Sequence, residues 1–160
     1  MNKKNVLISA CLMGVNCCYD GNGVPMEHLD GLMQNFHLIP VCPEILGGLP
    51  IPRRPAEILG DKVINNAGED VTEYFVRGAE EVLKIARLYD CRYAILKERS
   101  PSCGYGKIYD GTFSHTEVDG SGILAELLTG EGILVCGETD AGELTAMCRD
   151  MKNTPYQTEG

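Results

Sequence analysis

Four short apolar runs constrain the fold of this chain more than any other feature of its sequence. They are VLISA (residues 6–10), HLIPV (37–41), YAILK (93–97) and GILVCG (132–137). Continuous apolar runs of this length are typical of strands that are buried on both faces, as in a parallel sheet. Pro40 weakens the second run, because proline cannot donate a ladder hydrogen bond, and it indicates that this strand ends nearby.

Helical patterns separate the predicted strands. Residues 70–88 carry apolar side chains every three or four positions, with Thr72 as a candidate cap, and residues 123–128 read as a shorter helix. Strands that alternate with helices form βαβ units on a parallel sheet. We therefore expect one three-layer α/β/α, Rossmann-like domain with a mostly parallel sheet over residues 1–150, and a polar C-terminal tail over 151–160.

Proline and glycine mark the irregular segments. Residues 47–68 hold several of both, and we expect them to form an ordered loop over one edge of the sheet. Arg53 and Arg54 in this loop can hold a planar oxygen-bearing ligand, although an exposed surface pair is the more common role. Asp20 and Asp110, each in a YDG triplet, are expected to be turn residues.

Charge and cysteine content limit the class of partner. The chain has 14 basic and 23 acidic residues and a net charge of −9, which disfavours nucleic acid and anionic membranes as partners. No apolar run approaches the roughly eighteen residues of a membrane span. The apolar stretch before Cys11 is also too short for a signal peptide. Eight cysteines in 160 residues are fewer than a disulfide scaffold needs, so we expect the protein in the reducing cytoplasm.

Three cysteines follow predicted strands. Cys11 comes directly after the first run, Cys42 directly after the second, and Cys103 lies in the loop six residues after the third. Ligands of open parallel sheets bind outside the carboxyl ends of the strands, so these thiols are expected at one edge. Three thiolates leave one zinc position open, or leave one iron of a four-iron cluster without a protein ligand.

The pattern indicates no specific chemical role for the other cysteines, because free cysteine often serves as a small buried hydrophobic residue. We expect this role for Cys91 and Cys148. Cys17 and Cys18 are adjacent in a loop, so their side chains are expected to diverge without an assigned role. Cys136 is either a fourth ligand or a core residue.

Polar residues accompany the same three cysteines. Glu44 lies two residues beyond Cys42, and Ser100 and Ser102 both precede Cys103 in the SPSCG turn. A carboxylate and a hydroxyl at one site can act as an acid/base pair. A capping or solvated carboxylate and hydroxyl groups that stabilise a turn are the alternative roles.

Taken in order, the motifs resemble a known family. The segments SACLMGVNCCYDG, PVCPEILGGLPIPRRPAEI, DVTEYFVRGAEEVL and ILKERSPSCG, followed by IYDGTF, are similar to the family catalogued as domain of unknown function 523, whose characterised members are thiouracil desulfidases. The similarity runs from about Ser9 to Glu138. One departure is Cys18, where the family's NCRYDG motif has arginine.

The resemblance implies a 4Fe-4S cluster held by Cys11, Cys42 and Cys103, with the fourth iron open and easily lost in air. It also implies that Glu44 and a serine, Ser100 before Ser102, transfer protons while the sulfur of 2-thiouracil or a similar thioamide is replaced by oxygen without net redox change. Two alternatives stay open: a non-catalytic metal- or sulfide-binding module, and a thiol-dependent enzyme with Cys103 as nucleophile.

Overall fold

The structure, a computed structural model, describes residues 3–152, with side chains as far as residue 146. Within that range a four-stranded sheet forms the centre, in the order β2-β1-β5-β8, and each neighbouring pair is parallel. The strands are β1 (Lys4–Ser9), β2 (Phe36–Val41), β5 (Tyr93–Leu96) and β8 (Leu134–Gly137). They coincide with the four apolar runs, and the parallel sheet is as predicted.

Alternation along the strands builds two cores, one on each face of the sheet. Val6 and Ile8 of β1 pack on one face, and Leu7 between them packs on the other. Because both faces are covered, the strand is apolar at every one of these positions. Pro40 is tolerated because β2 is an edge strand with a single neighbour in the sheet.

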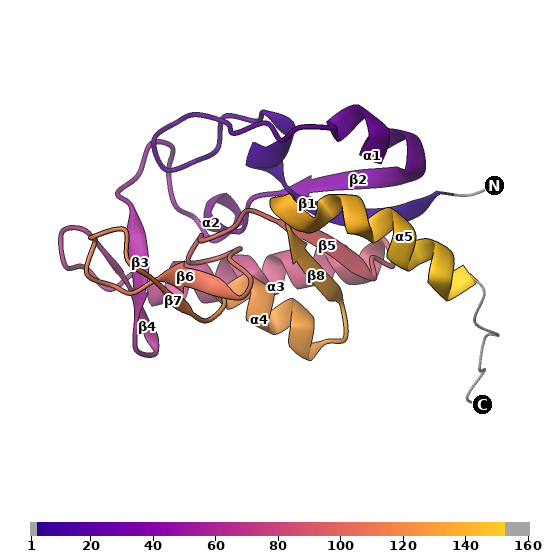
Figure 1. Ribbon diagram of the computed structural model, residues 1–160. Coiled ribbons are helices and arrows are strands. Elements are labelled where there is room, and N and C mark those ends of the chain that lie inside the picture. Colours follow the sequence, from indigo (N-terminus) through magenta and orange to yellow (C-terminus); the bar gives the residue numbers. More distant parts are fainter. Residues whose placement is uncertain (1–2, 153–160) are drawn as a thin grey trace.

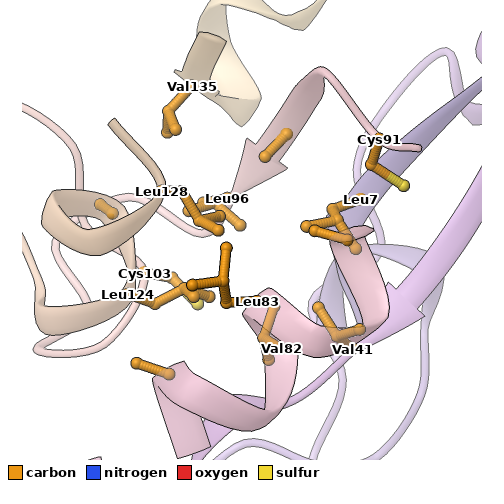
Figure 2. Close-up of a cluster of buried hydrophobic side chains, with 14 residues drawn as sticks. Leu7, Val41, Val82, Leu83, Cys91, Leu96, Cys103, Leu124, Leu128 and Val135 are labelled. Carbon is orange, nitrogen blue, oxygen red and sulfur yellow. The ribbon is translucent and has the colours of Figure 1, made fainter. Parts of the chain in front are cut away.

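Helices cover both faces (Figure 1). On one face lie α3 (Thr72–Leu88) and α4 (Ile123–Gly130), and on the other lie α1 (Leu29–Asn35) and α5 (Ala141–Lys152). Figure 2 shows the first core, where Val82 and Leu83 of α3 and Leu124 of α4 meet Leu7 and Leu96. The three-layer α/β/α architecture is therefore confirmed. Among the described helices, none has the length and apolarity needed to cross a membrane.

The ends of two predicted elements differ from the expectation. Asp70, rather than Thr72, supplies the acceptor at the start of α3, since its carboxylate accepts the Thr72 N–H at 3.0 Å. The Thr72 hydroxyl instead accepts the N–H of Val63 at 2.9 Å. Helix α5 continues through Lys152, two residues into the predicted tail. Residues 153–160 of that tail lie outside the described part of the chain, and the single domain over 1–150 stays a prediction.

The segment 47–68 is not the loop that was predicted, because it contains an antiparallel hairpin of β3 (Ala56–Leu59) and β4 (Lys62–Asn65). The strands are four residues each, and flanking prolines and glycines obscured their pattern. A second short hairpin, β6 (Lys107–Tyr109) and β7 (Glu117–Asp119), was also missed. Figure 1 shows both hairpins beyond the carboxyl ends of the central strands.

A close backbone contact fixes the segment after β2. The short helix α2 (Pro43–Leu46) packs against α3 through Gly47 and Gly78. A Cβ atom on Gly78 would lie 1.8 Å from the Pro43 carbonyl oxygen, and one on Gly47 would lie 1.9 Å from the Tyr74 carbonyl oxygen. Only glycine allows this approach, which holds the residues around α2 firmly against the domain.

Candidate functional site

The sheet has a switch point between β1 and β5, because the chain leaves β1 toward β2 on one side and continues from β5 to β8 on the other. Parallel sheets bind ligands in the crevice outside the strand ends at such a point. A cavity of about 610 Å³ opens there. Cys11, Cys42 and Cys103, although far apart in sequence, all line it.

Each of these cysteines has a different local setting. Cys11 lies in a 3-10 turn that directly follows β1 and is 8% exposed. Cys42 ends the extended segment after β2 and precedes α2. Cys103 is 3% exposed, in the turn after β5, and the hydroxyl groups of Ser9 and Ser102 lie near its sulfur, that of Ser102 at 3.7 Å. Ser9, which the sequence analysis missed, also accepts the N–H of Lys97 at 2.9 Å.

Two further cysteines line the cavity. The side chains of Cys17 and Cys18 have different neighbours among the predicted ligands: the Cys17 thiol lies near that of Cys42, and the Cys18 thiol lies near that of Cys11. After Cys11 the chain turns back toward the cavity at Gly14, which adopts a left-handed conformation with φ of 89°. In the sequence, the only indication that Cys17 and Cys18 lie at the cavity was their short distance from Cys11.

Burial dominates the electrostatics of these thiols. It raises the pKa of Cys103 to about 12, and together with the neighbouring Cys42 thiol it raises the pKa of Cys17 to about 12. Burial and the surrounding thiols also raise the pKa of Cys11 well above its usual value. A protonated thiol is a poor nucleophile, which counts against a metal-free role for Cys103. A bound metal cation reverses this preference, because it stabilises thiolates.

Among the residues with described side chains, no three His, Cys, Asp or Glu side chains gather closely enough to hold a single metal ion. The cysteines of an iron-sulfur cluster each bind a different iron and are therefore spread more widely around it.

Glu44, on α2, faces the same cavity with both carboxylate oxygens engaged. Oε1 accepts a hydrogen bond from Arg53 Nε at 3.1 Å, and Oε2 accepts one from the Ser102 hydroxyl at 3.0 Å. The Glu44 side chain is 17% exposed. Its orientation is thus fixed from two sides.

Arg53 is not the surface residue that its position among prolines indicated. Its side chain is 5% exposed and pairs with Glu44. It also donates hydrogen bonds to the carbonyl oxygens of Cys17 at 2.9 Å and Pro50 at 3.3 Å. Arg53 therefore joins α2 to the cysteine-bearing loop. The adjacent Arg54 is exposed, as expected, and bonds only to Asn66 among the described residues.

The two arginines provide a matched pair for a stability measurement. Replacing Arg53 with glutamine leaves Glu44 without its cation in a largely buried setting, and we expect this to lower the free energy of unfolding by about 3 kcal/mol. Urea denaturation measures the change. Arg54→Gln is the control, with an expected change below about 0.5 kcal/mol because that side chain is exposed. Equal effects of the two substitutions would contradict the structural role of Arg53.

The serines form a chain of hydrogen bonds that ends at Glu44. The Ser100 hydroxyl lies 2.9 Å from that of Ser102, which in turn donates to Glu44. Ser100 Oγ also accepts the backbone N–H groups of Ser102 at 3.2 Å and Cys103 at 3.1 Å. These two N–H groups occupy the lone pairs of Ser100 Oγ, and the proton of Ser102 goes to Glu44. The proton shared between the two hydroxyl groups is therefore that of Ser100. Ser102 therefore lies between Ser100 and Glu44, an order that the sequence left open.

Most of the other predicted residues are outside this arrangement, although Asp20 also lines the cavity. Cys136, in β8, is not among the described residues that line the cavity, which counts against a closed four-cysteine set. Cys91 is buried in the core, as expected. Cys148 lies on α5, beyond the described side chains. Asp20 and Asp110 each accept a backbone N–H two residues ahead, so both are turn residues as predicted.

Comparison with known proteins gives three matches. Residues 6–140 match the family described as 2-thiouracil desulfurase. The uncharacterized protein YbbK of Bacillus subtilis (strain 168) is 40% identical over 149 residues, which cover 87% of this chain and 99% of that protein. Among solved structures, the 4Fe-4S-dependent thiouracil desulfidase TudS is 42% identical, with a TM-score of 0.86 over 93% of this chain and 99% of that chain.

Proposed function

Since this chain is an enzyme of the 2-thiouracil desulfurase family, we propose that it uses an iron-sulfur cluster to remove sulfur from a small thiolated substrate such as 2-thiouracil. One observation carries the proposal: three thiols and a Glu44–Ser102–Ser100 chain of hydrogen bonds line a single cavity at the switch point of the sheet. The cavity volume of about 610 Å³ suits a pyrimidine-sized thiolated base or thioamide.

We propose that Cys11, Cys42 and Cys103 hold a 4Fe-4S cluster. The similar protein TudS is described as 4Fe-4S-dependent, and the buried thiols described here suit a cation that stabilises thiolates. When bound, a cluster with three cysteine ligands supplies one open iron, which can bind a soft thiocarbonyl sulfur and polarise the carbon–sulfur bond. Free thiols at this site also agree with the reducing cytoplasm as the location.

The proposed reaction is a hydrolysis without net redox change. Water provides the oxygen that forms the new carbon–oxygen bond, the carbon–sulfur bond breaks, and sulfide leaves. Glu44 is the group that accepts the proton of water, and Arg53 keeps its carboxylate turned toward the cavity through the bond at 3.1 Å. Positioned proton transfer of this kind contributes about 10²–10⁴-fold to the rate.

The serines return a proton from Glu44 to the substrate. At rest Ser100 donates to Ser102 and Ser102 donates to Glu44 Oε2, so both hydroxyl protons point toward the carboxylate. Once Glu44 holds the proton of water, both hydroxyl groups turn: Glu44 gives its proton to Ser102, Ser102 gives its own to Ser100, and Ser100 gives its own to a ring nitrogen or to the leaving sulfur. This gives the two serines distinct roles, with Ser100 as the terminal donor and Ser102 as the link.

Anaerobic reconstitution tests the proposal. We expect about four iron atoms per chain, a change in the absorption or resonance spectrum of the cluster when 2-thiouracil is added, and equal amounts of uracil and sulfide as products. A loaded protein that neither responds to 2-thiouracil nor releases sulfide would instead be a metal-binding module. Turnover without iron, with an adduct on Cys103 seen by mass spectrometry, would make it a thiol enzyme.

A further inference from the structure

The part of the cavity lining that comes from the second hairpin carries aromatic side chains to which the proposed chemistry gives no role. Tyr109, Phe113 and His115 line it, and all three come from β6 or from the loop between β6 and β7. The rings of Tyr109 and His115 contact each other edge to face, with centroids 5.6 Å apart. Phe113 is 37% exposed.

A buried carboxylate fastens this loop to the other hairpin. Glu57 of β3 is 9% exposed, and its Oε1 accepts the backbone N–H groups of Gly111 at 3.1 Å and Phe113 at 3.2 Å. The loop also approaches β3 closely, since a Cβ atom on Gly111 would lie 2.9 Å from the Ile58 carbonyl oxygen. The position of Phe113 is therefore set by β3 as well as by its own loop.

The backbone of Phe113 is held in an unfavourable conformation. Its φ is 58°, in the left-handed region that bulky side chains rarely adopt. Such conformations persist where the surroundings impose them, and they are concentrated where proteins hold ligands. Here the hydrogen bond from the Phe113 N–H to Glu57 Oε1, at 3.2 Å, fixes the peptide group that precedes this residue.

We propose that Phe113 is the surface on which the flat ring of the substrate stacks, and that Glu57 is the positioning residue that keeps it there. This inference rests on the proposed desulfidase function and narrows its substrate class to planar aromatic thiobases. A saturated cyclic thiourea has the same N–C(=S)–N unit and fits the cavity equally well, but it has no aromatic face to stack on the Phe113 ring. Stacking of a base on an aromatic side chain changes affinity by roughly 5-fold to 150-fold.

Two substrates distinguish stacking from other contacts. 2-Thiouracil is aromatic and flat, whereas 5,6-dihydro-2-thiouracil keeps the thiocarbonyl and ring nitrogens but loses the aromatic face. The substrate ratio is kcat/KM for 2-thiouracil divided by kcat/KM for 5,6-dihydro-2-thiouracil. In cluster-loaded Phe113→Ala we expect this ratio to fall by about 10-fold, mainly through a higher KM for 2-thiouracil. Calorimetry with uracil, the aromatic product, is expected to give a similar loss of affinity.

Further variants distinguish the loss of the Phe113 ring from a general disturbance of the fold. Phe113→Tyr keeps an aromatic face and is expected to keep the substrate ratio. Tyr89→Ala removes an aromatic side chain that is 54% exposed and is not among the described residues lining the cavity, so it is expected to change nothing. Glu57→Ala is expected to lower the ratio as Phe113→Ala does, and Glu57→Gln, which keeps an acceptor oxygen, is expected to restore it.

Adding Glu57→Ala to Phe113→Ala should then lower the ratio no further, because both substitutions remove the same contact. An unchanged ratio and unchanged uracil affinity in Phe113→Ala, with normal turnover of 2-thiouracil, would overturn the stacking proposal and leave the desulfidase function intact. Absence of turnover of either substrate by the loaded wild-type protein would instead refute the proposed function.

Discussion

Replacing Cys103 with alanine is expected to abolish cluster loading and desulfuration together, and Cys11→Ala and Cys42→Ala are expected to do the same. Each substitution leaves only two of three proposed thiolates at the cavity, and two ligands cannot hold a cluster of four irons. After anaerobic reconstitution, iron content is expected to fall from about four atoms per chain to nearly none. Iron analysis and visible absorption measure the loss, and circular dichroism verifies that the fold is retained.

The other cysteines provide matched controls. Cys91 is also buried, 5% exposed, but it precedes β5 at the end of the sheet opposite the cavity. Cys91→Ala is therefore expected to keep its iron. Cys17 and Cys18 contact the proposed ligands without being counted among them, so their alanine variants are expected to load the cluster as well. Full iron content in Cys42→Ala would refute the three-cysteine assignment.

The second large effect is expected at Glu44. Glu44→Gln keeps the side-chain length and one acceptor oxygen but cannot take up a proton at neutral pH. We expect kcat to fall by about 100-fold to 10,000-fold with the iron content unchanged. The measurement is the anaerobic rate of uracil formation from 2-thiouracil, expressed per loaded cluster.

An exposed carboxylate provides the control for this change. Glu73, on α3, has an 81% exposed side chain and pairs only with Arg77 among the described residues. Glu73→Gln is expected to leave kcat unchanged. If Glu44→Gln were as active as Glu73→Gln, proton transfer would have to come from another group. The losses of kcat in Ser102→Ala and Ser100→Ala, if unequal, would then show which of the two serines contributes more to proton transfer.

The sequence predicted the central sheet because a parallel strand buried on both faces has to be apolar along its length. The runs that became β1 and β5 are such strands, and the run that became the edge strand β8 is buried only in part. The identification of a desulfidase family from the cysteine motifs is confirmed by the match over residues 6–140. The rule that ligands bind outside the carboxyl ends of parallel strands was sufficient to bring Cys11, Cys42 and Cys103 together.

The two hairpins that line part of the cavity were not predicted from the sequence, for a physical reason. Strands β3 and β6 are only four and three residues long, and no core lies on both of their faces to impose a run of apolar residues. The burial of Arg53 was missed because it depends on a partner, Glu44, in a different element. The same holds for Glu57, whose hydrogen bonds go to residues 54 and 56 positions away.

The amino-acid sequence thus determined the layered α/β fold, the family, and the residues that meet at the carboxyl edge of the sheet, because each follows from hydrophobic periodicity or from local motifs. Only the tertiary structure decided the pairing of Arg53 with Glu44, the order of the two serines and the placement of Phe113 by Glu57. Those contacts join segments distant in the chain, and their directions depend on side-chain packing that no local pattern encodes.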